Sequence, residues 1–197
     1  DLAIRLWKIS RTECMIFVGE FIGVLFLGTI NGVLIGILLS FAEVIIRTAK
    51  PARCVLGIQP GHRHVRDFKE SSQIHAVSGV LIYRFSSNLF FANIQVLRQD
   101  IEDHVTQETK AVILDASGIG SIDITAADGL DILCKSLQKQ NIRFYITEHI
   151  AGLNEQLRKL GLGYLIEEGH VRRTIHIALK DMGIGRPYPL EGGVDNT

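Results

Sequence analysis

The chain has 197 residues, 47% of them hydrophobic, and its 21 basic and 21 acidic side chains give a formal net charge of zero. This balance argues against nucleic acid and against a strongly acidic substrate as partners. The three cysteines, at positions 14, 54 and 134, are widely spaced and form no CxxC or CxxH pattern, which argues against a disulfide framework and a zinc site, so we expect them to be reduced and structural.

The first predicted element is an apolar stretch from Cys14 to Ile46, in which only Glu20 and Glu43 carry charge. It is longer than the ~20 residues that one helix needs to cross a hydrocarbon core of ~30 Å, and it lacks the small-residue cleavage site of a secretory signal peptide. We therefore expect a membrane segment of a longer protein, with a buried hairpin in a soluble core as the alternative. Glu20 is costly in hydrocarbon, which indicates either a functional role or a hydrogen bond to a neighbouring helix.

Flanking charges and a central glycine cluster favour two helices over one long tilted helix in this stretch. Basic residues lie at positions 5, 8 and 11 before it and at 47, 50 and 53 after it. Because basic residues prefer the cytoplasmic side of a membrane, both ends should lie inside, which requires an even number of crossings. The sequence GTING, residues 28–32, is typical of a turn. Glycines also recur every four or five residues, which lets helix backbones approach closely, and we expect the hairpin to dock on helices outside this chain.

The sequence after Pro51 has the pattern of a soluble domain. Short strands are predicted in CVLGI and HVRDF, around a turn at residues 59–61, and in VSGVLIYRF, which ends at Phe85. An amphipathic helix follows over residues 92–105, because apolar side chains recur there at steps of three and four. The apolar run AVILD, residues 111–115, is predicted to be a buried strand.

The remaining elements complete an α/β pattern. A second helix is predicted from about Thr125, where Asp128 three residues later fits a capping box. The strand IRFYIT, a helix ending at Gly161 and a last helix from about Val171 to Met182 follow. This alternation predicts a mainly parallel sheet with helices packed against it. The tail from residue 183, with two prolines and four glycines, is predicted to be flexible.

The loop between the strand 111–115 and the following helix is the candidate functional site. In open α/β sheets ligands bind at the carboxyl ends of the strands, and this loop leads into a helix N-terminus, which favours an anion. Six residues are candidates for a regulatory site or for a nucleotide or phosphate site: Ser117, Gly118, Gly120, Ser121, Asp123 and Thr125. The sequence has no GxxxxGKS, GxxxxGKT or GxGxxG motif, so a tight connection capped by Asp123 or Thr125 is the alternative.

No set of residues in the sequence indicates catalysis or a bound metal ion. Ser117 and Ser121 lie outside any GxSxG nucleophile elbow, and no carboxylate pair stands out. His62 and His64 could present two ligands on one strand face, but no third ligand is positioned to complete a metal site, so surface histidines are the favoured interpretation. We therefore expect no enzyme activity, no cofactor and no metal site.

Several segments, taken in order, resemble the C-terminal part of SulP-type sulfate permeases. They are RLWKISRTECMI, the apolar hairpin, RTAKPARCVLGIQPG, VSGVLIYRFSSNLFFAN and AVILDASGIGSIDITAADGL, and the resemblance covers residues 5–182. It implies the last two transmembrane helices of a transporter, residues 1–48, followed by a cytosolic STAS domain, residues 49–182, and a flexible tail, residues 183–197. The implied α/β fold is that of the anti-sigma-factor antagonists, a mixed β-sheet with flanking helices.

The resemblance also implies a function and a location. Members of this family are secondary anion transporters, typically of sulfate, whose membrane domain transports and whose STAS domain serves regulation or assembly. The implied protein is a multi-pass protein of the cell inner membrane with a cytoplasmic STAS domain. Its implied partners are the membrane, the anion, which helices outside this chain would bind, a guanine nucleotide or a regulatory protein on the STAS surface, and a second copy in a homodimer. No role in anion binding is implied for Glu20.

In the antagonist relatives a serine in the pattern Asp-Ser-Ser-Gly is the phosphorylation switch. The matching residues here are Asp123, Ile124, Thr125 and Ala126. Ile124 occupies the phosphoacceptor position and cannot accept a phosphate, whereas Thr125 takes the place of the second serine and keeps a hydroxyl. The alternative to a transporter module is a membrane-tethered signalling switch like these antagonists or a guanine-nucleotide-binding STAS module, in which the nucleotide would bind at residues 117–121.

Overall fold

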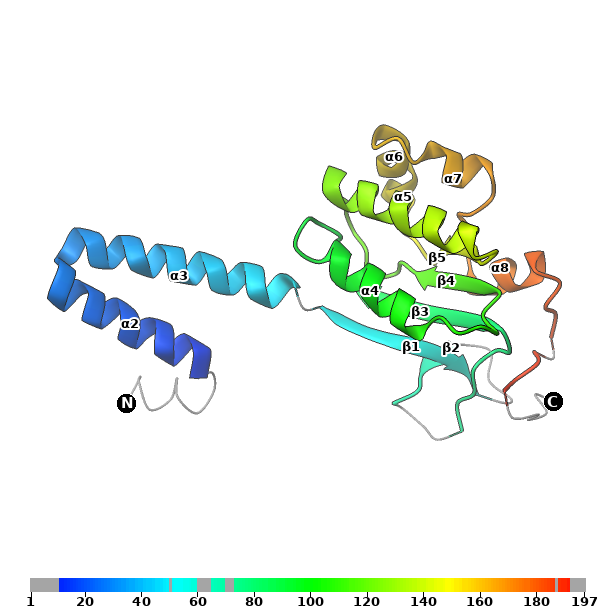
Figure 1. The fold of residues 1–197 in the computed structure, drawn as a ribbon, viewed down its shortest axis with the longest axis horizontal. Coiled ribbons are helices and arrows are strands. Elements are labelled where there is room, and N and C mark those ends of the chain that lie inside the picture. The colour runs from blue at the N-terminus through cyan, green and yellow to red at the C-terminus, as the bar shows by residue number, and fades with distance from the viewer. Residues whose placement is uncertain (1–10, 50, 60–64, 70–72, 187, 192–197) are drawn as a thin grey trace. The chain divides into compact units, whose positions relative to one another are not determined.

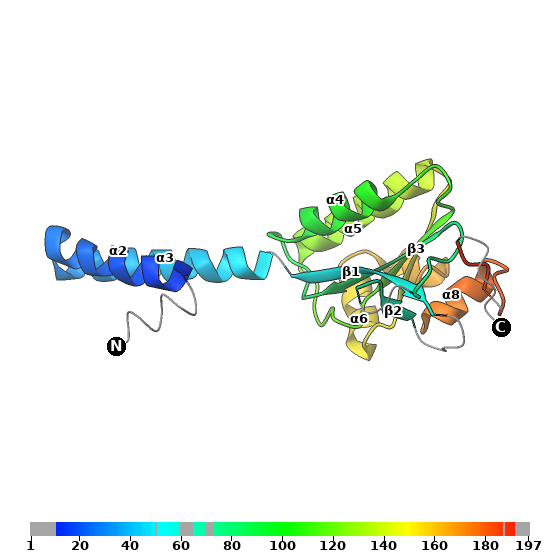
Figure 2. The same cartoon turned by 90° about the horizontal axis from the view of Figure 1, so that it is seen from below.

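The chain forms two compact units, Asp1–Ala49 and Lys50–Thr197, in a computed structural model (Figures 1 and 2). The structure describes residues 11–49, 51–59, 65–69, 73–186 and 188–191. The first unit contains the helices α2 (Arg11–Leu27) and α3 (Thr29–Ala49). The second unit contains β1 (Ala52–Ile58), β2 (Val65–Asp67), β3 (Val80–Ser86), α4 (Ile94–His104), β4 (Ala111–Asp115), α5 (Ile124–Lys139), β5 (Arg143–Thr147), α6 (Ala151–Lys159), α7 (Gly163–Glu167) and α8 (Ile175–Asp181).

The apolar stretch folds as a helical hairpin. Only Gly28 separates α2 from α3, and its left-handed φ of 83° is a conformation that glycine adopts without steric cost. The segment Thr29–Ile46 of α3 is long and apolar enough to cross a membrane, whereas the apolar part of α2, Cys14–Phe26, is shorter. Large apolar side chains point outward from the hairpin, among them Phe26, 83% exposed, and Ile30, 84% exposed. Because the core of a soluble protein would bury such side chains, this surface is suited to lipid or to other transmembrane helices.

The two helices approach each other closely at two glycines. A Cβ atom at Gly32 would lie 2.3 Å from Cγ2 and 2.6 Å from Cα of Val24, and one at Gly23 would lie 3.6 Å from Cα of Gly32. Small residues at such positions let two helix backbones come into contact. These two glycines therefore serve packing inside the hairpin, whereas the sequence pattern alone indicated docking on helices outside this chain.

The second unit is built on a mixed five-stranded sheet of order β2-β1-β3-β4-β5. Strands β3, β4 and β5 are parallel neighbours, while β1 runs antiparallel to both β2 and β3. The parallel part follows from the crossover connections through α4 and α5, since parallel neighbours need a helix or a comparable segment between them. The predicted α/β fold with a mixed sheet and flanking helices is confirmed.

Alternate side chains of the sheet enter two separate cores. On one face, Tyr83 and Phe85 of β3 and Leu114 of β4 pack with α4, α5, α6 and α7. On the other face, Ile82 of β3 and Ile113 of β4 pack with α8 and with the C-terminal segment. Figure 2 shows α4 and α5 on one side of the sheet and α8 on the other. Because the parallel strands are buried on both faces, their sequences are continuous apolar runs.

Two elements near the C-terminus differ from the sequence prediction. The last helix was expected from about Val171 to Met182, but Val171 instead forms a β-bridge with Ile146 of β5, and α8 begins only at Ile175. Helix α7 was not expected, because its five residues are too few to show helical periodicity. The turn expected at residues 59–61 lies largely outside the described residues.

The C-terminal segment corrects the expectation of a flexible tail from residue 183. Tyr188 and Leu190 are each 6% exposed and belong to the core that contains α8. Leu190 forms a β-bridge with Val77, and the N–H of Ser78 donates to the carbonyl of Pro189 at 2.8 Å. The glycine and proline content indicated disorder, but the two apolar side chains complete the cover of the second sheet face and hold the segment in place. Residues 192–197 lie outside the described residues.

We predict that Gly32→Ala destabilises the hairpin, because the added methyl group would overlap the backbone of Val24. Overpacking of this kind costs about 1–3 kcal/mol. Gly19→Ala is the matched control, since a Cβ atom there meets Cδ1 of Leu39 at 3.8 Å, an ordinary contact. Thermal melting of the full chain in lipid nanodiscs, followed by circular dichroism of the helices, compares the two variants. Equal melting temperatures would contradict the close contact.

We also predict that Leu190→Ala lowers the free energy of unfolding of the second unit by about 2–4 kcal/mol, because it removes a buried leucine side chain. Ile177→Ala on α8 is the control, since Ile177 is 41% exposed and its truncation should cost less than about 1 kcal/mol. Urea unfolding of the full chain measures both. The same loss in both variants would show that the C-terminal segment adds nothing to the core.

Candidate functional site

Three polar residues form a row across the carboxyl ends of the parallel strands. The strand register pairs Arg84 of β3 with Asp115 of β4, and Asp115 with Thr147 of β5. Each residue lies two positions after a member of the core that contains α8, so all three side chains are on that face of the sheet. Open α/β sheets bind ligands at this edge.

The carboxylate of Asp115 joins β3, β4 and the loop that follows β4. Nε and Nη2 of Arg84 both donate to Oδ2 of Asp115 at 2.8 Å, and the N–H of Ser117 donates to Oδ1 at 2.9 Å. The side chain of Asp115 is 1% exposed and that of Arg84 is 36% exposed. A carboxylate buried this deeply is stable only with such partners. The pair therefore fixes the guanidinium of Arg84 while leaving part of it accessible.

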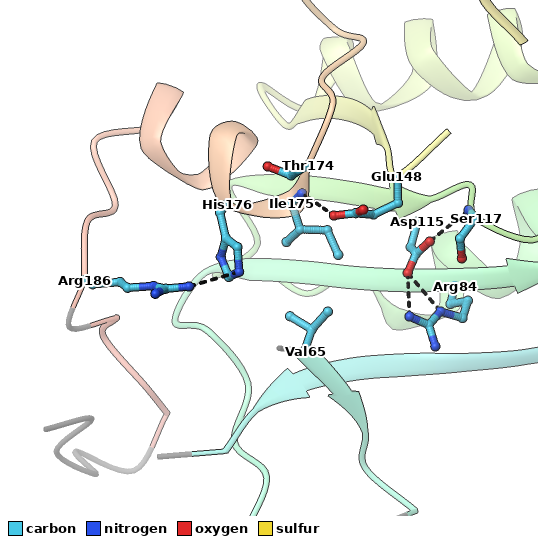
Figure 3. Close-up of a pocket in the computed structure, with 9 residues that line it drawn as sticks. All are labelled: Val65, Arg84, Asp115, Ser117, Glu148, Thr174, Ile175, His176 and Arg186. Carbon is cyan, nitrogen blue, oxygen red and sulfur yellow. Dashed lines mark hydrogen bonds and ion pairs between the residues drawn. The ribbon is translucent and has the colours of Figure 1, made fainter. Parts of the chain in front are cut away.

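A pocket of about 550 Å³ opens beside this row. Figure 3 shows Arg84, Asp115 and Ser117 at one end of the pocket and His176 and Arg186 at the other. The rest of the lining consists of Val65, Glu148, Thr174 and Ile175. A pocket of this size is comparable to sites for small molecules, which measure about 300–1,000 Å³.

Glu148 forms part of the pocket wall and has a strained backbone. It follows β5 directly and has a left-handed φ of 54°, which is unusual for a residue other than glycine. Its Oε1 accepts a hydrogen bond from the N–H of Ile175 at 3.1 Å. Thr174, the N-cap of α8, accepts one from the N–H of Ile177 at 3.3 Å. Strained residues persist where the surrounding structure holds them and are common at functional sites. The hydrogen bonds of Glu148 and Thr174 hold this wall at the start of α8.

The opposite end of the pocket is held by a network from α8 and the C-terminal segment. Nε of Arg186 donates to the hydroxyl of Tyr188 at 3.2 Å, and Nη2 of Arg186 lies 3.1 Å from Nε2 of His176. The Tyr188 hydroxyl lies 2.7 Å from Nδ1 of His176, and the two rings are stacked. Because a guanidinium can only donate, Nε2 of His176 is the acceptor in this arrangement and the ring proton is on Nδ1.

The glycines of the loop after β4 serve close packing. A Cβ atom at Gly118 would lie 2.6 Å from Cα of Ser86, and one at Gly120 would lie 2.9 Å from Oδ1 of Asn88. Ile119 between them is 1% exposed. The absence of a side chain therefore lets Gly118 lie against the end of β3 and Gly120 against the segment that follows it.

Several backbone N–H groups of this loop already donate to acceptors within the protein. The pairs are Gly120 and Ser121 to Oδ1 of Asn88 at 3.0 and 3.1 Å, Ile122 to Oε1 of Gln156 at 2.9 Å, and Asp123 to the carbonyl of Leu89 at 3.1 Å. A phosphate-binding loop directs such groups at its ligand. The loop is therefore organised as a tight connection, which was the alternative left open from the sequence.

Asp123 caps α5 and occupies the position that an anion would take. Its Oδ1 accepts from the N–H of Ala126 at 2.7 Å and its Oδ2 from the N–H of Phe91 at 2.9 Å. The capping box predicted for Thr125 and Asp128 is wrong, because α5 begins at residue 124 and Thr125 already lies in its first turn. The negative charge of Asp123 stabilises the positive end of the helix dipole.

The six residues selected from the sequence thus have separate roles in the structure. Ser117 lines the pocket, Gly118 packs against the end of β3, and Gly120 packs against Asn88. Asp123 caps α5, and Ser121 and Thr125 are exposed. The structure does not gather them around one ligand position.

A second polar cluster, on the α4 side of the sheet, has a structural role. The hydroxyl of buried Tyr83 donates to Oδ2 of Asp100, and Nε of Arg53 lies 3.1 Å from the same oxygen. Burial and then this hydrogen bond raise the pKa of Tyr83 far above its usual range. Cys54 of β1 packs instead against the core that contains α8. Burial and then the charge of Asp67 raise the pKa of its thiol to about 11. Such a thiol stays protonated at neutral pH and is a poor nucleophile.

Within the described ranges, no group of three or more His, Cys, Asp or Glu side chains is arranged to hold a metal ion. His62 and His64, which the sequence analysis considered as ligands, lie outside the described residues. All three cysteines are free thiols, and Cys14 and Cys134 are buried.

Sequence reasoning selected the loop but missed most of the pocket, namely Arg84, Asp115, Glu148, Thr174, His176 and Arg186. A signal for the first two was present, since Arg84 and Asp115 each follow four apolar residues of a predicted strand and the strand order makes them neighbours. The others belong to segments whose positions depend on tertiary packing.

Comparison with known proteins places the second unit in a family. The STAS domain family model matches residues 71–178, more than half of the chain. This chain belongs to the STAS domain family.

Relatives of known name extend the match beyond that domain. A probable sulfate transporter of Mycobacterium tuberculosis is 33% identical over 179 residues, which cover 89% of this chain and 32% of the relative. High affinity sulfate transporter 2 of Stylosanthes hamata is 27% identical over 194 residues, 93% of this chain and 29% of the relative. Each match covers more residues than the second unit, Lys50–Thr197, has in total. Both matches therefore include part of the hairpin. The resemblance to SulP-type sulfate permeases is confirmed.

The structure of the murine Slc26a9 anion transporter in the inward-facing state has a similar fold, with a TM-score of 0.79 and 23% sequence identity. The match covers 92% of this chain and 30% of that chain. This chain therefore spans about a third of the length of the proteins it matches.

We predict that Asp123→Ala lowers the free energy of unfolding of the second unit by about 1–2 kcal/mol, because the cap of α5 and the bond to Phe91 are both lost. Thr125→Ala is the matched control and should change it by less than about 0.5 kcal/mol, since Thr125 is exposed. Urea unfolding distinguishes them. A larger loss of unfolding free energy in Thr125→Ala than in Asp123→Ala would instead support the capping box predicted from the sequence.

Proposed function

We propose that this chain is the C-terminal portion of a SulP-type secondary anion transporter that carries sulfate, with the STAS domain as its regulatory and interaction module. The direct junction of two different elements carries this proposal. Helix α3, which is long and apolar enough to cross a membrane, ends at Ala49, and β1 of the STAS domain begins at Ala52. The relatives named as sulfate transporters match both parts together, whereas a soluble antagonist would have no use for the hairpin.

In the proposed arrangement the protein is a multi-pass protein of the cell inner membrane and the STAS domain is cytoplasmic. Arg47 lies near the end of α3, Lys50 follows that helix in the sequence, and Arg53 lies in β1, four residues after Ala49. This basic junction favours the cytoplasmic side. A hairpin returns the chain to the side from which it entered, which places its basic N-terminal flank on the same side.

Transport itself is assigned to helices outside this chain. A hairpin of two helices cannot enclose an anion path alone, and its outward apolar side chains are suited to packing in a larger bundle. We assign no anion-binding role to Glu20 and no catalytic role to the STAS domain. The named relatives are transporters, in keeping with a protein that is not an enzyme.

Regulation is assigned to the carboxyl edge of the sheet. Phe91 is 59% exposed and Ile124 is 68% exposed, and the hydrogen bond from the Phe91 N–H to Asp123 places them near each other. Exposed apolar side chains next to a rigid loop are suited to docking of a regulatory protein or a second copy of the chain. A guanine nucleotide would have to rely on the exposed hydroxyls of Ser117 and Ser121, because the neighbouring N–H groups are already bonded.

A membrane-tethered phosphorylation switch is less well supported. Ile124 stands where the antagonists carry the phosphorylated serine. Thr125 is exposed and accessible to a kinase, but Asp123 beside it already supplies negative charge to the start of α5.

The test is uptake of radiolabelled sulfate by a sulfate-transport-deficient bacterium that expresses the full-length protein containing this chain. Truncation after Ala49 should reduce uptake by at least about tenfold relative to the intact protein, measured at equal surface abundance. A version truncated after Glu191 is the matched control, because it keeps every described residue of the STAS domain. Full uptake without the STAS domain would overturn its regulatory role, and no uptake by the intact protein would overturn sulfate as the substrate.

A further inference from the structure

A second pocket, of about 530 Å³, lies at the amino ends of the parallel strands, at the edge opposite the first pocket. Ser78, Lys110 and Asn141 come just before β3, β4 and β5, and Arg143 is the first residue of β5. The remaining wall comes from Met182 and Ile184 after α8 and from Pro189 of the C-terminal segment.

The two basic residues are neighbours across adjacent strands. The N–H of Arg143 donates to the carbonyl of Lys110 at 3.0 Å, and the N–H of Lys110 donates to the carbonyl of Gly79 at 2.8 Å. These bonds join the starts of β3, β4 and β5. They place two cationic side chains at one pocket by rigid backbone contacts rather than by a flexible loop.

The charge of this pocket is not balanced. None of its lining residues is acidic, and neither Lys110 nor Arg143 has a carboxylate within ion-pair distance in the described part of the chain. By contrast, the first pocket pairs Arg84 with Asp115 and also contains Glu148. A bound anion would supply the negative charge that the lining of this pocket lacks.

The opposite wall is apolar and comes from the C-terminal segment. Met182 and Ile184 are partly buried against the core that contains α8. The N–H of Ser78 donates to the carbonyl of Pro189, which holds this wall against the start of β3. A ligand that fits must therefore present an acid group on one side and an apolar body on the other.

We propose that this pocket binds a small amphipathic anion, a carboxylate or phosphate group on an apolar chain, with the acid group at Lys110 and Arg143 and the apolar body against Met182 and Ile184. The site lies at the edge of the sheet opposite the first pocket, and binding does not depend on which anion the full-length protein carries.

Methyl NMR of the full chain in zwitterionic lipid nanodiscs tests the proposal. The chain contains two methionines, of which Met182 lines the pocket and Met15 is exposed on the hairpin. With ¹³C-methyl methionine, hexanoate and hexyl phosphate should each shift the Met182 signal saturably. Hexanol, which lacks the charge, and inorganic sulfate, which lacks the apolar chain, should bind at least about tenfold more weakly.

The decisive variant is Lys110→Gln with Arg143→Gln, both exposed and outside the core. It should raise the dissociation constant of hexanoate at least about tenfold, since charge-assisted bonds to the acid group are lost. The control is Arg158→Gln with Lys159→Gln on α6, which removes the same charge from an exposed surface outside the pocket. This control should leave the dissociation constant of hexanoate unchanged. Equal binding of hexanol and hexanoate, equal effects of the two double variants, or parallel shifts of Met15 and Met182 would each overturn the proposal.

Discussion

Burial of β4 on both of its faces is the constraint on which the rest of the second unit depends. All five residues of this strand are buried, so each face must be covered by another part of the chain. Helices α4 and α5 cover one face, whereas among the described helices only α8, seven residues long, covers the other. Tyr188 and Leu190 supply the missing apolar cover. The C-terminal segment packs on the sheet because the second face of β4 must be covered. This packing also sets the position of Arg186.

The loop after β4 shows how side chains can replace a ligand. Its glycines and its position before a helix would suit a phosphate, yet Asn88 and Gln156 accept its N–H groups and Asp123 caps the helix. These three side chains come from three different segments, and the loop joins them. Because several of its N–H groups already have acceptors within the protein, the loop is suited to hold a fixed surface at Phe91 and Ile124.

How much could be predicted from the sequence depended on the range of the interactions involved. The hairpin, the strands and the helices α4, α5 and α6 follow from apolar periodicity and glycine positions, which are local properties. The cap of α5 was assigned to the wrong residue, because Asp123 and Thr125 are both good caps and the choice rests on the contact with Phe91, far away in the sequence. The pocket at the carboxyl edge needs the strand register for Arg84 and Asp115. It also needs the docked tail for Arg186, which composition alone assigned to a flexible segment.

The C-terminal segment is the physical link between the two pockets of the STAS domain. Arg186 lines the first pocket, while Ile184 and Pro189 line the second, and all three lie close together in the sequence after α8. Where the ligands of both pockets prefer particular positions of this segment, each must change the affinity of the other by the same factor, because coupling between sites is reciprocal. Tyr188 and Leu190 anchor the segment in the core, so such coupling would pass through small shifts of a packed wall rather than through undocking of the tail. An amphipathic anion at the amino edge could in this way adjust the carboxyl edge without contacting it.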